Sequence, residues 1–328
     1  AEWWEGLREG CGELGIKQVN LIYYCNVHSN NADLPGKAMV YSGGDHPAHA
    51  DDLAGRENDF DRILAEHQIL IAVTELSATA PLKLNAARLG LRAATMPGFT
   101  PGMVPALKLD YEEINRRCIE MKELLDPADA AHMLFEAAGE RHRLTLDLRF
   151  RQATASGGLV REQGKAGNLP SGETYIVPYE GERPDEQSRT SGMLPVEIDG
   201  ELLHYRIDAN QIAEVIGEGK VAQAERDYLA AEPAYGNVAE LGLGVLADYG
   251  IAPVGELLLD EKLGMHIAFG RSDHFGGQVG AKQFSSPDKV VHIDRVYTPE
   301  MQPSVKVLEV DLETAGSRAP LMRDGRYV

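Results

Sequence analysis

Hydrophobic positions in the first half of the chain alternate between short apolar runs and helical patterns. The runs at 18–25 and 68–74 are short and apolar, as strands are, and residues 59–67 have the pattern of a helix. Residues 110–125 place apolar side chains about every 3.6 positions, as an amphipathic helix does. Strands that take turns with helices favour an open, mainly parallel sheet flanked by helices. We therefore expect an α/β domain over residues 1–150.

The second half of the chain is dominated by strand patterns. Segments such as ETYIVPYEG, LPVEIDG and KVLEVDL are β-like and are separated by Gly, Pro and charged turns. Helical patterns are fewer, and the clearest lie at 210–221 and 223–231. A segment rich in Gly and Ala at 153–172 predicts an exposed connection with a long loop. Residues 151–328 are therefore expected to form a strand-rich α+β domain.

Composition indicates the cellular compartment of the protein and excludes some classes of partner. The chain has 328 residues, which is long enough for two separate cores. Its formal net charge of −19 would repel nucleic acids and anionic membrane surfaces, so we expect no nucleic-acid and no membrane partner. The sequence has no run of about 18 apolar residues, and its start lacks the pattern of a signal peptide. Three scattered cysteines favour a reducing, cytoplasmic compartment.

Two residues that can bind metal interrupt an apolar run near the end of the chain. His292 and Asp294 lie two positions apart in VVHIDRVY, so in a strand their side chains point to the same face. An imidazole beside a carboxylate is a common ligand pair for first-row metals. A buried histidine that pairs with an aspartate for purely structural reasons fits this short pattern equally well.

Further polar residues in apolar or Gly-rich surroundings strengthen the metal interpretation. Glu261 and His266 flank the turn-like KLGM, and His266 opens the apolar run HIAFG. Glu240 lies in NVAELGLGVL, and Glu173 lies in NLPSGETYIVP. An unpaired carboxylate in an apolar setting is costly to ionise, and a bound cation removes that cost. The alternatives are a structural histidine at position 266 and a solvated turn residue at position 173.

Taken in order, these motifs carry a family resemblance. The set NLPSGE, AELGLG, DEKLGMHIAFG, GG and HIDRVY resembles the aminopeptidase T family of metallo-exopeptidases, often described as leucyl aminopeptidases, and spans most of the second half of the chain. The segment DYEEI after MPGFT also resembles that family. The resemblance implies a two-metal site in the β-rich C-terminal domain, and a homodimer. It also implies six metal ligands: Glu173, Glu240, Glu261, His266, His292 and Asp294.

One position departs from the family pattern. The family has a tyrosine seven residues after the histidine of HIALG, whereas this chain has Asp273 there, followed by His274. We expect Asp273 or His274 to replace the tyrosine, and Glu173 or Glu240 to transfer the proton of an activated water. The implied activity is hydrolysis of N-terminal residues from short peptides with two divalent ions, which can be zinc, cobalt, manganese or magnesium.

Two other classes of function stay open. Some relatives of this fold resemble 2,5-dihydroxypyridine dioxygenases, which open a hydroxylated pyridine ring at an iron(II) site of two histidines and one carboxylate, and the short chain favours this alternative. Such relatives have a histidine in place of Glu240 and lack an equivalent of His266, which favours the peptidase instead. The third class is a metal-binding protein without this catalytic activity, and the missing tyrosine supports it.

Overall fold

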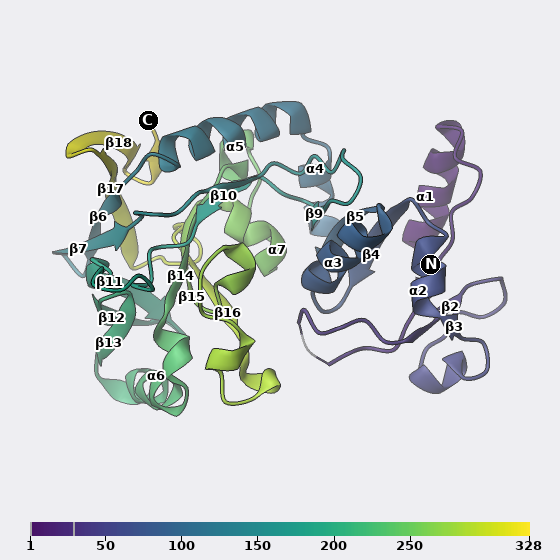
Figure 1. The fold of residues 1–328 in the computed structure, drawn as a ribbon. Helices are drawn as coiled ribbons and strands as arrows, with labels where there is room; N and C mark the ends of the chain where they lie inside the picture. Colours follow the sequence, from purple (N-terminus) through teal and green to yellow (C-terminus); the bar gives the residue numbers. More distant parts are fainter. Residues whose placement is uncertain (1, 29) are drawn as a thin grey trace. The chain divides into compact units, whose positions relative to one another are not determined.

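The computed structural model describes residues 2–28 and 30–328, which divide into two compact units (Figure 1). Unit 1 comprises the described residues up to 98 together with 160–168, and unit 2 comprises 99–159 and 169–328. The sequence placed residues 1–150 in one domain, whereas the structure places 99–150 in unit 2. The reason is strand pairing across a long sequence separation, because residues 130–137 pair with residues 305–313 and residues 144–145 pair with residues 191–192.

Unit 1 is built from short helices and strands around a small parallel sheet. Strands β4, β5 and β9 pair in parallel, whereas β1, β2 and β3 pair antiparallel. The run at 18–25 was expected to be a strand, but only two of its residues form one, in the antiparallel sheet. The elements are α1 (Glu2–Glu13), β1 (Ile22–Tyr23), β2 (Lys37–Val40), β3 (Asn58–Asp59), α2 (Phe60–Ala65), β4 (Ile69–Thr74), α3 (Thr79–Leu89), β5 (Arg92–Pro97) and β9 (Ala166–Asn168).

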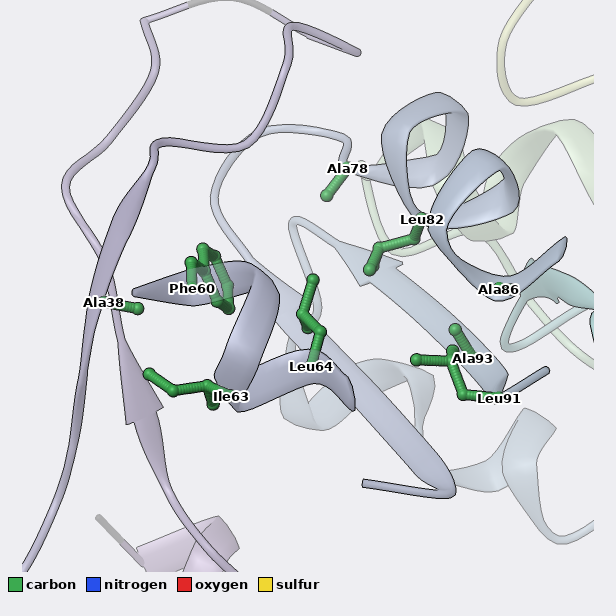
Figure 2. Close-up of a cluster of buried hydrophobic side chains, with 9 residues drawn as sticks. All are labelled: Ala38, Phe60, Ile63, Leu64, Ala78, Leu82, Ala86, Leu91 and Ala93. Carbon is green, nitrogen blue, oxygen red and sulfur yellow. The ribbon is translucent and has the colours of Figure 1, made fainter. Parts of the chain in front are cut away.

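Local chemistry fixes the helix ends of unit 1, and apolar packing holds its core. Helix α2 begins after Asp59, whose carboxylate accepts a hydrogen bond from the backbone N–H of Arg62 at 2.8 Å. Helix α3 ends at Gly90, which adopts a left-handed φ of 68°. Figure 2 shows the core that these elements enclose. Its buried side chains are Ala38, Phe60, Ile63, Leu64, Ala78, Leu82, Ala86, Leu91 and Ala93.

Unit 2 contains an eight-stranded and a five-stranded antiparallel sheet. The larger sheet has the order β13-β12-β11-β7-β6-β17-β18-β19, and the smaller sheet has the order β16-β15-β14-β10-β8. The strands are β6 (Ala130–Ala137), β7 (Glu140–Asp147), β8 (Thr154–Ser156), β10 (Glu173–Ile176), β11 (Ser191–Ile198), β12 (Glu201–Asp208), β13 (Gln211–Ile216), β14 (Val238–Gly244), β15 (Met265–Gly270), β16 (His292–Val296), β17 (Val305–Thr314), β18 (Ser317–Arg323) and β19 (Arg326–Tyr327).

Unit 2 also contains α-helices, which separate some of these strands in the sequence. The pattern at 110–125 forms the predicted helix α5 (Tyr111–Leu125), which packs against β8 and β10. The predicted helix at 210–221 is wrong, because residues 211–216 form β13 and pair with β12 through a turn in which Asn210 has a φ of 69°. The following helix is α6 (Gly219–Ala231), and the remaining α-helices in the described part of unit 2 are α4 (Val104–Leu107) and α7 (Leu257–Asp260).

The structure bears out a mixed α/β fold with a parallel three-stranded sheet in the N-terminal part and strand-rich, antiparallel sheets in the C-terminal part. Among the described residues, none of the helices combines the length and the apolar character that crossing a membrane requires.

Candidate metal centre

The five-stranded sheet brings together residues that lie far apart in the sequence. Glu240 on β14 pairs with Ala268 on β15, and Ala268 pairs in turn with Asp294 on β16. Residues paired across neighbouring strands point to the same face of a sheet, as do residues two apart on one strand. By the same rule Glu173 on β10, which pairs with Gly244, lies on this face. The predicted ligands on the shared face are Glu173, Glu240, His266, His292 and Asp294.

Small residues on the same face leave room for these long side chains. A Cβ atom on Gly242 would lie 1.9 Å from Nε2 of His266, and a Cβ atom on Gly244 would lie 2.2 Å from the backbone carbon of Lys262. Neither approach is sterically possible for a residue larger than glycine without movement of the neighbour. The glycines of the AELGLG motif are therefore needed for the imidazole and the carboxylates to converge.

Two groups of ligand atoms result, and they share one carboxylate. The deep group consists of Glu173, Glu240 and His266, and the rim group consists of Glu240, His292 and Asp294. In each group the ligand atoms lie within 4.8 Å of one another, close enough to hold one metal ion. Oε1 of Glu240 lies 3.4 Å from Nε2 of His266, and its Oε2 lies 3.0 Å from Nε2 of His292. Glu240 thus directs one oxygen into each group.

The remaining distances show how closely the ligand atoms of each group approach one another. Nε2 of His266 lies 3.6 Å from Oε2 of Glu173, and Nε2 of His292 lies 3.6 Å from Oδ1 of Asp294. The side chains of the deep group are at most 8% exposed, whereas that of His292 is 19% exposed. Solvent therefore reaches the centre from the side of the rim group.

A backbone carbonyl orients the imidazole of His292. Its Nδ1 lies 2.7 Å from the carbonyl oxygen of Arg271, so the Nδ1–H donates to that oxygen and Nε2 is directed toward Glu240 and Asp294. Metal-binding histidines are commonly held in this way, with one ring nitrogen bound to a carbonyl and the other directed at the ion. The contact prepares His292 for metal binding.

The charges of the two groups depend on one another. Burial raises the pKa of Glu240, but His266 and His292 outweigh this effect and hold that pKa well below its ordinary value. Burial lowers the pKa of His266, yet Glu240, Asp294 and Glu173 raise it to about 9. The pKa of His292 is also raised, because Asp294 and Glu240 outweigh its burial. Without a metal, the imidazoles carry the positive charge that the carboxylates require.

A buried lysine joins the centre beside the deep group. Lys262 lies in a short 3-10 helix, η5 (Glu261–Leu263), and is 1% exposed. Its Nζ donates a hydrogen bond to Oε1 of Glu173 at 2.5 Å and another to Oε1 of Glu261. Sequence reasoning missed this lysine, although its place in the apolar segment LLLDEKLGMHIAFG is unusual for a charged residue and was a usable signal.

The pairing with Lys262 also determines where Glu261 lies. Glu261 was predicted to be a metal ligand, but its carboxylate belongs to neither group and contacts the ammonium of Lys262 instead. Burial and the nearby carboxylates raise the pKa of Glu261 to about 8. Its assignment as a ligand stays a prediction, and a metal would have to displace Lys262 to reach its Oε1.

The donor set fits a divalent cation. Oε2 of Glu173 is buried and has no hydrogen-bond partner, and such an atom is costly to leave unpaired. Four carboxylates (Glu173, Glu240, Glu261 and Asp294) converge on the single ammonium of Lys262 and two imidazoles. Mixed carboxylate and imidazole ligands suit zinc, manganese, cobalt and iron. The free oxygen of Glu173 and the convergence of carboxylates and imidazoles both favour a bound cation.

Aspartate and histidine at the position of the family tyrosine have different surroundings. Asp273 and His274 lie in η6 (Asp273–Phe275), and Asp273 accepts a hydrogen bond from Nε of Arg271 at 2.6 Å. The ring of His274 lies 5.5 Å from that of His292, between ring centroids. Burial, followed by the charges of His292 and Arg271, lowers the pKa of His274 to about 4, so its imidazole is neutral at pH 7. Only His274 faces the rim group.

Two aromatic rings that sequence reasoning missed lie next to the rim group. The ring centroid of Phe275 is 5.2 Å from that of His292 and 3.9 Å from that of His274. Tyr175 on β10 lies 4.6 Å from Phe275, again between centroids. Tyr175 belongs to the row of paired residues that contains Gly242 and His266, so its distance of two positions from Glu173 was a signal for this placement.

Comparisons with known proteins connect this geometry to a fold. No protein-family model matches the sequence, and no curated protein matches it either. Among solved structures, a 2,5-dihydroxypyridine dioxygenase from Pseudomonas putida is similar, with a TM-score of 0.58 and 16% identity over 82% of this chain and 74% of that chain. AmpT from Thermus thermophilus is similar with a TM-score of 0.52 and 21% identity over 82% of this chain and 78% of that chain. At these identities the likeness shows a shared fold.

Proposed function

We propose that this chain is a metal-dependent aminopeptidase that removes N-terminal residues from short peptides at a centre of two divalent ions. The observation that carries the proposal is the position of Glu240, which directs one carboxylate oxygen into each ligand group. A carboxylate shared in this way is the arrangement that lets two ions act on one water molecule. The fold shared with AmpT and the family resemblance of the five motifs support the same function.

Each of the two groups would bind one metal ion. Glu173, Glu240 and His266 would hold one ion, and Glu240, His292 and Asp294 would hold the other. Bound divalent ions lower the pKa of a water molecule and polarise a carbonyl group, which supplies the nucleophile and the electrophile of peptide hydrolysis. The carbonyl of Arg271 keeps His292 in the tautomer that this role requires.

Proton transfer and substrate binding are assigned to the side chains around the metal centre. Lys262 fixes one oxygen of Glu173, so the other, which is free of hydrogen bonds, would be the atom that meets the deep ion. The same oxygen could accept the proton of the attacking water only when it is not bound to that ion. His274 is neutral and lies beside the rim group, where it can donate a hydrogen bond to the developing oxyanion in place of the family tyrosine. The acidic surroundings favour the ammonium group of a peptide N-terminus.

A specific observation favours a second candidate, a mononuclear iron dioxygenase that acts on a hydroxypyridine. Lys262 already places a positive charge against Glu173 and Glu261, so a single ion in the rim group would leave a balanced site. The aromatic rings of Phe275 and His274 beside that group suit a flat substrate. Similarity to a solved 2,5-dihydroxypyridine dioxygenase supports this candidate at the level of the fold.

Metal analysis combined with a substrate screen tests the proposal. The purified chain is loaded in turn with zinc, manganese, cobalt and iron(II), and each form is assayed with aminoacyl anilides and with 2,5-dihydroxypyridine under oxygen. We expect two ions per chain and release of the anilide. One iron per chain with oxygen-dependent ring opening would establish the dioxygenase instead. Bound metal without turnover of either class of substrate would leave a metal-binding protein of another function.

A further inference from the structure

We infer that the two ligand groups fill in a fixed order, the rim group first, because Lys262 serves as a built-in cation for the deep group and weakens metal binding there. The inference rests on the proposed metal centre and adds an assignment for a residue that is not itself a ligand. Lys262 is a positioning residue, since its ammonium contacts Glu173 and Glu261 and would act on a metal through them.

Lys262 cannot easily leave the deep group. Its side chain is 1% exposed, and its Nζ lies 2.5 Å from Oε1 of Glu173. The backbone around it is also fixed, because the N–H of Gly244 donates to the carbonyl of Gly264 at 2.9 Å and the absent side chain of Gly244 makes space for the backbone of Lys262. A buried ammonium held on both sides in this way stays in place.

The two groups differ in the positive charges that face their carboxylates. In the deep group, Glu173 shares one of its two oxygens with an ammonium before any metal arrives. In the rim group, Glu240 and Asp294 face the imidazole of His292 at 3.0 and 3.6 Å, and the ammonium of Lys262 pairs with Glu173 and Glu261 rather than with these two carboxylates. A metal in the deep group must therefore bind beside a carboxylate that already pairs with a fixed ammonium, whereas the carboxylates of the rim group pair with imidazoles, which are themselves ligands.

Like charges in a buried site repel strongly. The interaction between two charges at the separation of neighbouring side chains is several-fold larger inside a protein than in water. Exposure adds to the difference, since the rim group is the part of the centre that solvent reaches. We therefore expect the first ion to bind the rim group and the second to bind the deep group more weakly, by about 10-fold or more.

The experiment titrates the metal-free chain with Mn²⁺ or Zn²⁺ by calorimetry and counts bound ions by elemental analysis. Wild type should bind in two separated steps, and Lys262→Met should tighten the second step by about 10–100-fold, the range found for changes next to metal ligands. Lys262→Arg should keep the second step weak, because it keeps the charge. Lys306→Met is the matched control, since Lys306 is exposed and pairs with Glu136 on the other sheet.

A measurement on wild type keeps the inference testable if Lys262→Met does not fold. Histidine ring resonances, assigned with His266→Gln and His292→Gln, are followed by NMR during a Zn²⁺ titration. The first equivalent should shift the resonance of His292 and the second that of His266. Two steps of equal affinity, or resonances that shift together, would overturn the inference and leave the metal centre intact. No metal binding at all would instead contradict the proposed function.

Discussion

The five-stranded sheet of unit 2 and the parallel sheet of unit 1 break the usual rule of burial in opposite ways. The five-stranded sheet buries charge, because Glu173, Glu240 and His266 are 6%, 3% and 1% exposed. Strand β4 of the parallel sheet instead exposes large apolar side chains, with Ile69 and Ile71 at 49% and 46%. Inward-facing residues of β4 pack against the core of unit 1, so its exposure is confined to one face.

The difference teaches where function is concentrated in this fold. Buried carboxylates reduce the stability of the protein unless something compensates them, so their presence indicates a ligand. Exposed apolar residues cost little in stability and are common on protein surfaces, so they indicate much less. Changes to the five-stranded sheet should therefore have large effects on metal content, and changes to the outer face of β4 should have small ones.

The largest effect is expected from Glu240→Gln. This change removes the one carboxylate that both ligand groups share and leaves an amide that binds divalent ions poorly. We expect metal content to fall to near zero and aminopeptidase activity to fall by at least about 100-fold. The measurement is elemental analysis of the purified variant together with its rate on leucine anilide.

A matched change separates loss of the centre from a general effect of losing a carboxylate. Glu214→Gln alters an exposed glutamate on β13 that pairs with Arg206 at the surface. This control should keep its metal content and activity, since surface pairs contribute about 0–1 kcal/mol to stability. If Glu240→Gln retains two ions and its full rate, the assigned centre is incorrect.

Gly242→Ala should have the next largest effect, because it introduces a methyl group into the space that His266 occupies. The new Cβ would lie 1.9 Å from Nε2 of His266, so the ring must move away from Glu173 and Glu240. We expect a loss of about 1–3 kcal/mol in the free energy of unfolding, which is typical of overpacking. Binding at the deep group should weaken while the rim group keeps its ion.

The control for this glycine lies in a helix with open surroundings. A Cβ atom added to Gly10 of α1 would meet no atom of a neighbouring element within 4 Å, so Gly10→Ala should be neutral or stabilise the chain by up to about 1 kcal/mol. Chemical denaturation and metal titration of both variants give the two quantities. Equal stability and equal metal affinity in Gly242→Ala and wild type would contradict the close contact with His266.

The stability of the metal-free protein should depend on pH because of the buried charges. The pKa of His266 is about 9 in the folded chain and about 6.5 in an unfolded one, so its stabilisation is complete below pH 6.5 and is lost as the pH rises through 9. Glu261, with a pKa raised to about 8, acts in the same direction. We expect the melting temperature of the metal-free chain to fall between pH 7 and pH 9.5.

Metal binding should have the opposite dependence on pH. A metal replaces the proton of His266, so affinity rises as the pH approaches 9, and the loaded chain should lose less stability over the same range. Thermal melting with excess EDTA and with saturating Zn²⁺ at each pH gives both curves. A melting temperature of the metal-free chain that increases from pH 7 to pH 9.5 would contradict the buried imidazolium.

Local patterns were sufficient to predict part of the fold. The helical spacing at 110–125 and the apolar run at 68–74 correctly predicted α5 and β4, because each pattern lies within a single element. The extent of each unit could not be predicted in this way. Lys306 of β17 and Glu136 of β6 contact one another across 170 positions, and no local pattern encodes such a pairing.

The candidate site was predictable to a similar degree. His292 and Asp294 were found because charged residues in an apolar run have a cost that needs a reason. Lys262 was missed because its significance depends on the position of Glu173, which is 89 residues away. Phe275 was missed for a related reason, since an aromatic residue in a Gly-rich loop shows its role only when the loop is placed beside His292.

The smallest effect is expected on the outer face of β4. There Ile71→Thr replaces the ethyl group of a side chain that is 46% exposed by a hydroxyl group. Its free energy of unfolding should change by at most about 0.5 kcal/mol, as surface substitutions usually do. Leu82→Ala in the core of the same unit should cost about 2–5 kcal/mol, because Leu82 is 4% exposed and leaves a cavity. Neither variant should change the number of bound ions, since neither residue lies on the five-stranded sheet. Loss of metal in Ile71→Thr would mean that the contrast between the two sheets does not locate the function.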